Sequence, residues 1–291
     1  MTAPSPLWPS QLDHIRIDTD DPPALAAFYR DILGMAAWQT TDGSFVLTGP
    51  QRRIVVGRGE PGAQPYGAFK LQTPRQLAEL RTFLEARGVA LLPSPTPLFG
   101  PDALAVRDPD GRLAVFGLPR ADMPAGDHSG FKPVASALPG RLQHVVVAST
   151  RLQEMMDFYV EALGFVVSDY VRETSGNRAN TVCFMRSDPE HHSFAVFRAP
   201  ASRADHHCYE ATCWNDLRDW ADHLSRHEIK IWWGPGRHGP GNNLFLMCKD
   251  PNGYLFEISA ELEIMPYEMA PRVWDHGERA LNLWGPGFMR S

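Results

Sequence analysis

The chain has 291 residues, 43% of them hydrophobic, and a formal net charge of −6, which is enough material for one large or two modest folded domains. The acidic balance and the lack of a basic block argue against nucleic acid as a partner. No run approaches the roughly 20 apolar residues of a membrane span, and the first residues lack the features of a signal peptide. Four scattered cysteines are typical of reduced thiols, so we expect a cytoplasmic globular protein.

Both halves of the chain open with the same pattern. Residues 12–35 align without a gap on residues 142–165, sharing L-x-H at the start, an F-Y pair and a closing L-G. Each segment predicts an alternating strand followed by a helix that ends at a glycine, Gly34 or Gly164. The sequence therefore uses one β-α opening twice.

The rest of each half repeats as well. The segment that starts at Thr73 aligns on the segment that starts at Cys213, and each predicts a helix followed by a strand. Residues 106–118 align on 248–260, where D-P-D-G and D-P-N-G predict turns between two strands. We therefore predict an α+β protein of two tandem modules, each built from paired β-α-β-β-β units.

These repeats divide the chain into four parts. An N-terminal module covers residues 1–118 and a second module covers residues 141–264. Between them, residues 119–140 are rich in Pro, Gly, Ala and Ser without periodicity, which predicts a linker. Residues 265–291 form a tail rich in Trp, Pro and Gly after the last module strand.

The second half carries three potential metal ligands. They are His144 on its first strand, the His206-His207 pair before its second helix, and Glu257 on its last strand. Glu257 lies inside the apolar run YLFEIS, where a buried charge is costly unless it is paired or binds a cation. Taken singly, each candidate has an ordinary explanation. Glu257 can lie on a solvated face of its strand, His144 can be a core histidine, and His206-His207 can be a pair in a solvated loop. Their coincidence in one half favours a metal site.

The first half lacks two of these ligands. It has His14 on its first strand, but Tyr66-Gly67 and Val115 stand where the second half has the histidine pair and Glu257. We therefore predict that the N-terminal module binds no metal. Two histidines and a carboxylate form the facial triad of non-haem Fe(II) enzymes that activate O2. The same ligands hold zinc in some hydrolases, so ligand types alone leave the metal open.

Residues 142–263 resemble the catalytic module of the two-module type I extradiol dioxygenases, members of the vicinal-oxygen-chelate (glyoxalase/bleomycin resistance/dioxygenase) superfamily. By this resemblance the metal ligands are His144 in L-x-H-V, His207 as the second member of its pair, and Glu257 after the D-P-N-G turn. His192 in HHSFAVF lies fifteen residues before His207, which implies the role of active-site acid and base. His238 in GPGRHG lies nineteen residues before Glu257, which implies a contact with substrate or oxygen.

The substrate pocket departs from this family at one position. Ten residues before the metal Glu the family commonly has a Tyr, and this chain has Met247. A thioether offers a weak acceptor in place of a phenolic donor, so we expect better activity on substituted or bicyclic diols than on plain catechol. Phe184, Trp233 and Asn243 are further candidate pocket residues.

The resemblance implies cleavage of a catechol-like ring by O2 at Fe(II), with Mn(II) as the alternative metal, in a homo-oligomer. A small aromatic diol and O2 would then be its substrates. The tail would cover the active-site mouth with Arg272, Trp274 or Trp284, or pack as an arm on the surface or on another subunit. Two other functions stay open: a metal-dependent isomerase, lyase or hydrolase on the same fold, and a ligand-sequestering protein. Zinc or nickel would favour the former, and no metal the latter.

Overall fold

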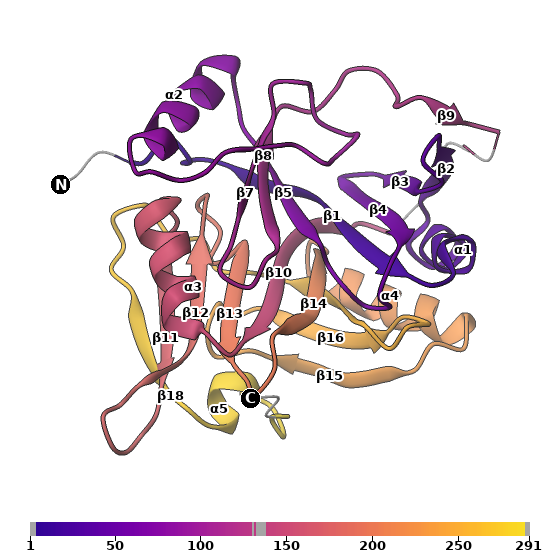
Figure 1. The fold of residues 1–291 in the computed structure, drawn as a ribbon. Coiled ribbons are helices and arrows are strands. Elements are labelled where there is room, and N and C mark those ends of the chain that lie inside the picture. Colours follow the sequence, from indigo (N-terminus) through magenta and orange to yellow (C-terminus); the bar gives the residue numbers. More distant parts are fainter. Residues whose placement is uncertain (1–3, 130, 132–137, 289–291) are drawn as a thin grey trace.

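Two nine-stranded sheets, one in each half of the chain, organise the protein (Figure 1). The computed structural model describes residues 4–129, 131 and 138–288. The strand orders are β6-β7-β8-β5-β1-β4-β3-β2-β9 and β15-β16-β17-β14-β10-β13-β12-β11-β18. Each strand of one sheet has its counterpart at the same place in the other, which confirms the predicted α+β fold of two tandem modules.

The elements of the first sheet and its helices run in chain order: β1 (Gln11–Thr19), α1 (Pro22–Leu33), β2 (Ala36–Thr40), β3 (Phe45–Gly49), β4 (Arg52–Arg58), β5 (Tyr66–Lys70), α2 (Pro74–Glu85), β6 (Leu92–Pro93), β7 (Leu104–Arg107), β8 (Leu113–Gly117) and β9 (Gly126–Asp127). The second half follows: β10 (Arg141–Ser149), α3 (Leu152–Asp157), η1 (Phe158–Ala162), β11 (Val166–Arg172), β12 (Asn180–Arg186), β13 (Phe194–Arg198), β14 (Arg203–Glu210), α4 (Trp214–Arg226), β15 (Ile231–Arg237), β16 (Leu244–Lys249), β17 (Leu255–Ala260), β18 (Arg272–Asp275) and α5 (Glu278–Leu281). Both modules therefore consist of two β-α-β-β-β units.

The first helices of the two modules begin differently but end at equivalent glycines. Asp21 caps α1 by accepting a hydrogen bond from the backbone N–H of Ala24, and Gly34 ends it in the left-handed region at φ 61°. In the second module α3 has no side-chain cap and continues into the π-helical turn η1 before Gly164 at φ 87°. The closing L-G pattern therefore ends both helices.

The two modules share one hydrophobic core, and the repeated motifs contribute two of the buried hydrogen bonds between them. The Tyr29 hydroxyl on α1 donates to Asp250 at 3.0 Å, and the Tyr159 hydroxyl on η1 donates to Asp108 at 3.2 Å. Each tyrosine belongs to an F-Y pair, and each aspartate opens a D-P-x-G turn of the other module. The repeated motifs therefore join the modules to each other.

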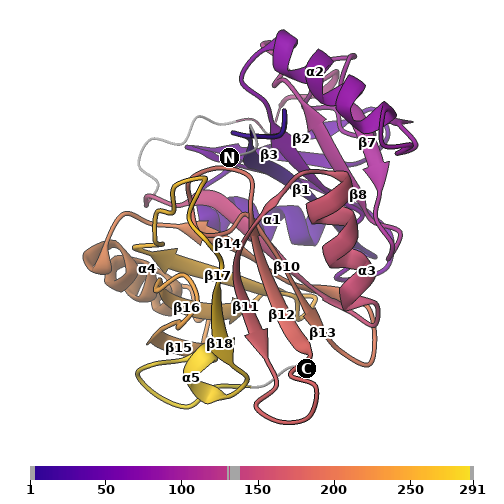
Figure 2. The same ribbon diagram turned by 90° about the vertical axis from the view of Figure 1, so that its left-hand side faces the viewer.

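A short strand from outside each module completes its sheet. Gly126 and Asp127, within the expected linker, form β9 and pair with β2, whereas residues 130 and 132–137 of that linker lie outside the described residues. In the tail, β18 pairs in parallel with β11 and lies along the edge of the second sheet (Figure 2). Among the described helices none is long and apolar enough to cross a bilayer.

Candidate metal centre and active-site cavity

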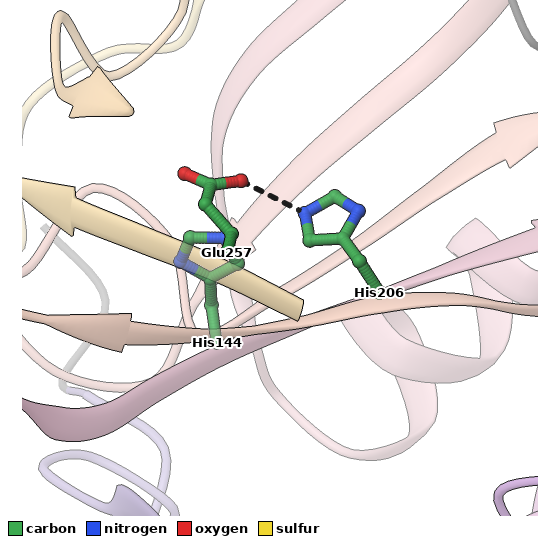
Figure 3. Close-up of side chains that lie close together, drawn as sticks. All are labelled: His144, His206 and Glu257. Atoms are coloured by element: carbon green, nitrogen blue, oxygen red, sulfur yellow. Dashed lines mark ion pairs between the residues drawn. The ribbon is translucent and has the colours of Figure 1, made fainter. Parts of the chain in front are cut away.

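Three neighbouring strands of the second sheet bring together two histidines and a glutamate. His144 on β10 pairs with Cys208 on the neighbouring strand β14, and Cys208 pairs in turn with Glu257 on β17. Directly opposed residues point to the same face of a sheet, and so do residues two apart, which adds His206 to this face. The ligand atoms of His144, His206 and Glu257 lie within 4.8 Å of one another, and His206 Nε2 is 3.3 Å from Glu257 Oε2 (Figure 3).

The structure corrects one expected member of this cluster. His207 follows His206 on β14, so its side chain points to the opposite face of the sheet. There its ring packs against Tyr29, Tyr209 and Tyr254, at centroid distances of 5.8, 5.2 and 5.1 Å. The expectation that His207 lies beside His144 and Glu257 is therefore wrong, and His206 occupies that place.

Hydrogen bonds orient both histidines of the cluster toward Glu257. Gln143 Oε1 lies 3.3 Å from Nδ1 of His144, and Asp205 Oδ2 lies 2.7 Å from Nδ1 of His206. Because each partner oxygen accepts the Nδ1 proton, Nε2 of each ring keeps its lone pair for a metal. Burial lowers the pKa of His144 to about 3, so this imidazole is neutral at neutral pH.

Glu257 is buried with one carboxylate oxygen left for a cation. Its Oε1 accepts a hydrogen bond from Asn243 Nδ2 at 3.2 Å, whereas Oε2 has no hydrogen-bond partner among the described residues. Burial acts to raise the pKa of Glu257, but the nearby His238 and the other histidines outweigh it and lower the pKa to about 2. A buried carboxylate beside two imidazoles fits a divalent metal, and two histidines with one carboxylate suit Fe(II).

The two histidines predicted to act in catalysis lie beside this cluster. The His192 ring is 4.2 Å from the His144 ring between centroids, and burial lowers its pKa well below the usual value. His238 stacks on Phe245 at 3.8 Å and donates from Nδ1 to the backbone carbonyl of Leu281 at 2.5 Å. Its Nε2 is 3.9 Å from Glu257 Oε1. Both rings therefore present a nitrogen to the region of the metal ligands.

A mostly apolar cavity opens onto the cluster. Its walls are formed by His144, Val146, Val171, Val182, Phe184, His192, Phe197, His206, Trp233, His238, Pro240, Met247, Glu257, His276, Gly277, Ala280, Leu281 and Phe288. Of the predicted pocket residues, Phe184, Trp233 and Met247 line it, whereas Asn243 lies behind Glu257 and does not. The described lining contains no Lys or Arg, and Glu257 is its one carboxylate.

The tail forms part of this cavity, but through residues other than those predicted. Arg272 Nε and Trp274 Nε1 bond the buried Asp169, at 2.8 and 2.9 Å, and so fasten the tail to β11. The cavity wall comes instead from the following segment, which includes His276 and Leu281. Sequence reasoning missed these wall residues because the tail has no periodicity, and only its pairing with β11 shows where it runs.

At the equivalent position in the N-terminal module, the histidine is already hydrogen-bonded through both ring nitrogens. His14 bonds Asp13 through Nδ1 at 2.6 Å and Thr96 through Nε2 at 2.5 Å, so both ring nitrogens are engaged. Tyr66 and Val115 occupy the register positions at which the second module has His206 and Glu257. Within the described residues, the His144, His206 and Glu257 cluster is the one group with metal-binding geometry.

Comparisons with known proteins agree with this architecture. The family model of the Glyoxalase/Bleomycin resistance protein/Dioxygenase superfamily matches residues 11–116 and 141–258. Metapyrocatechase 2 of Cupriavidus necator is 28% identical over 94% of this chain and 88% of its own length. The iron-dependent extradiol dioxygenase of Rhodococcus jostii is 24% identical over 95% and 96%.

A solved structure shows the same fold. The Mn(II)-bound glyoxalase from Novosphingobium aromaticivorans superposes with a TM-score of 0.75 and 25% identity, over 96% of this chain and 91% of that one. The matched ranges run from β1 into β8 and from β10 into β17, so they include the positions of all three clustered ligands. The chain therefore belongs to the Glyoxalase/Bleomycin resistance protein/Dioxygenase superfamily.

Proposed function

We propose that this protein is an extradiol dioxygenase that opens a catechol-like ring with O2 at iron held by His144, His206 and Glu257. The observation that carries the proposal is the convergence of these three ligands at the base of an apolar cavity, with the buried His192 ring against that of His144. Relatives over nearly the whole chain are named as a metapyrocatechase and an iron-dependent extradiol dioxygenase. Mn(II) is the alternative metal, since the similar glyoxalase is Mn(II)-bound.

Iron held by His144, His206 and Glu257 would supply the redox chemistry that the activation of O2 requires. The chain supplies the proton transfer. His192 is neutral because burial lowers its pKa, so its imidazole is ready to accept a proton from a substrate hydroxyl. The protonated ring can then return that proton to an oxygen of the opened product.

His238 holds the second polar position in the cavity. The Leu281 carbonyl accepts its Nδ1 proton and Phe245 fixes its ring plane, so Nε2 is directed toward Glu257. With a methionine at position 247, a substrate hydroxyl can donate to Nε2 of His238, and this hydrogen bond replaces the one that the family's tyrosine would give to the same oxygen. Its Nε2 then meets that oxygen at an orientation set by the tail.

The cavity selects an uncharged diol with an apolar substituent. Valines, phenylalanines, Trp233 and Met247 surround the space beyond the metal ligands, and the described wall has no cation to pair with a carboxylate. A carboxylated diol would lose its hydration there without a compensating partner. The one polar side chain that the tail adds is His276, whose Nδ1 bonds Thr181 at 2.9 Å.

Oxygen uptake after anaerobic reconstitution with Fe(II) tests the proposal. We expect uptake of one O2 per ring opened, fastest with alkyl- or aryl-substituted catechols and slowest with carboxylated ones. Iron-loaded protein that consumes no O2 with any diol of the panel would overturn the proposal. Size-exclusion chromatography of the same sample tests the further proposal, drawn from the family, that the protein is a homo-oligomer.

A second function on the same site has a specific basis. The similar solved structure is called a glyoxalase, and Met247 replaces the tyrosine common in the dioxygenases. An isomerase or lyase would use the same ligands and His192 for proton transfer, but it would consume no O2. Turnover under argon, with Mn(II) or zinc in place of iron, would favour this alternative.

A further inference from the structure

The hydrogen-bond partner of His192 is unlike those of the other histidines at the site. His144, His206 and His238 each bond through Nδ1 to an oxygen. His192 Nδ1 instead lies 2.9 Å from Nδ1 of His191, a nitrogen that can either donate or accept. The protonation of His191 therefore decides which nitrogen of His192 carries its proton.

Asp169 on β11 fixes the protonation of His191. Its Oδ2 lies 2.9 Å from His191 Nε2, and an ionised carboxylate can only accept, so Nε2 of His191 carries the proton. The neutral His191 ring then has a lone pair at Nδ1, which must accept from His192 Nδ1–H. Both histidines and Asp169 are buried, and burial lowers the pKa of His191, which favours this neutral ring over a cation.

We infer that Asp169 and His191 are positioning residues that hold His192 as the Nδ1–H tautomer, so that its Nε2 presents a lone pair to the cavity. The inference rests on the proposed function for the use of that lone pair, which accepts the proton of a substrate hydroxyl. The opposite tautomer would present an N–H at the same place and could not act as the base. Asp169 and His191 thus set the starting state of proton transfer without touching the substrate.

The tail stabilises this arrangement from behind. Arg272 bonds both oxygens of Asp169, at 2.8 and 3.1 Å, and Trp274 donates to Oδ2. Burial would raise the pKa of Asp169, but His191 and Arg272 outweigh it and lower that pKa, so the carboxylate stays ionised. The segment that completes the cavity wall is thereby joined to the residues that orient His192.

Two substitutions of His191 separate positioning from packing. His191→Asn places a side-chain oxygen near the former Nδ1 and can still accept from His192 Nδ1–H. His191→Phe keeps a ring of similar size but offers no acceptor. We expect His191→Phe to lower kcat about 10²-fold, the lower end of what an acid/base group contributes, with KM and iron content unchanged. His191→Asn should stay close to wild type, and His227→Phe, at the exposed residue that follows α4, is the ring-substitution control.

Nitrogen-15 NMR of the zinc-substituted chain reads the tautomer without any turnover, with His192→Phe to assign the signals. Wild type and His191→Asn should show a protonated Nδ1 and an unprotonated Nε2 at His192, whereas His191→Phe and Asp169→Ala should show a mixture of the two tautomers. An unchanged Nδ1–H signature in His191→Phe, or equal kcat in His191→Phe and wild type, would overturn the inference. Wild-type protein without O2 uptake would refute the proposed function instead, and the NMR result would stand apart from it.

Discussion

At the scale of single residues, the position of one side chain along β14 decides the metal site. The sequence offers His206 and His207 as neighbours, and alternation along a strand places only one of them on the face of His144. Which one depends on the register between β10 and β14, which shifts at a bulge between Leu142 and His144. That shift cannot be derived from composition or spacing, and the family pattern pointed to the wrong member of the pair.

His206 and His207 consequently give opposite predictions for metal retention. His206→Ala should abolish tight metal binding, because it removes one of three ligands. His207→Ala should keep the metal but lower the free energy of unfolding by about 2–5 kcal/mol, the usual range for truncating a large buried side chain. Metal analysis per chain after gel filtration, together with urea unfolding, measures both. Retention of metal by His206→Ala with loss from His207→Ala would restore the assignment based on the family pattern.

Met247 gives the second prediction at this scale. It pairs with Glu257 in the β16–β17 register and lines the cavity, so Met247→Tyr can return a phenolic donor to the site. We expect this variant to speed cleavage of plain catechol by about 2–10-fold, since a neutral hydrogen bond is worth about 0.5–1.5 kcal/mol. His238→Ala should harm wild type more than it harms the Met247→Tyr background, because both side chains hydrogen-bond the same substrate oxygen, Tyr as donor and His238 as acceptor.

Oxygen uptake on catechol and on larger diols, for the four members of this mutant cycle, measures the effect. Fast cleavage of unsubstituted catechol by wild type, with little effect of His238→Ala, would contradict this account of the missing tyrosine.

At the scale of elements, equivalent strands of the two modules form different sites. In the second module they bring the candidate metal ligands together, and in the first they place His14 in hydrogen bonds with Asp13 and Thr96. β1, β5 and β8 hold His14, Tyr66 and Val115 in the registers that β10, β14 and β17 use for the ligands. The hydroxyl of Thr96, from the segment after β6, forms a hydrogen bond with Nε2 of His14. Tyr66 and Val115 leave no carboxylate there, so one of the two homologous places is suited to a metal.

We therefore predict one metal equivalent per chain. His14→Ala should leave metal content unchanged, because its ring nitrogens are bonded to Asp13 and Thr96 rather than directed at a cluster of ligands. Titration of the metal-free chain with Fe(II) or Mn(II) under argon gives the stoichiometry. Two equivalents bound with similar affinity, or loss of metal on replacing His14, would show that the N-terminal module is also a metal site.

The path of the tail could not be predicted from the sequence. The predicted residues Arg272 and Trp274 fasten the tail, whereas Trp284 is among the exposed large hydrophobic residues. The tail reaches the cavity because β18 adds to the edge strand β11, a pairing between segments about one hundred residues apart. Local pattern carries no signal for such an edge pairing, so the segment around His276 could not be assigned to the cavity in advance.

At the scale of the whole molecule, the repeat was the most predictable feature. The gapless alignment of the L-x-H and F-Y motifs, together with the repeated D-P-x-G turn further along each half, predicted both modules and the order of their units. The contact between modules was not predictable from either repeat alone. Tyr29 with Asp250, and Tyr159 with Asp108, join the F-Y pair of one module to the turn of the other.

These contacts between modules make stability depend on pH in a defined direction. Burial raises the pKa of Asp250 to about 6, against 3.8 as its ordinary value. Between those two pH values the folded chain binds the proton that the unfolded chain releases, so this group favours folding below pH 4. Its contribution is lost as pH rises from about 4 to 6, at up to about 1.4 kcal/mol per pH unit.

Asp250→Asn removes this titration and leaves the other ionisable groups in place. The free energy of unfolding of Asp250→Asn should therefore rise relative to wild type as pH increases from 4 to 6, and the difference should level off above pH 6. Tyr29→Phe should act in the opposite sense, because its hydroxyl lowers the pKa of Asp250 and its removal makes the buried carboxylate costlier at pH 7 than at pH 4. Urea unfolding of the three proteins from pH 4 to 8 measures both differences. A constant difference across this range would mean that Asp250 titrates in the folded chain as it does in the unfolded one, and that the hydrogen bond between modules is not coupled to its charge.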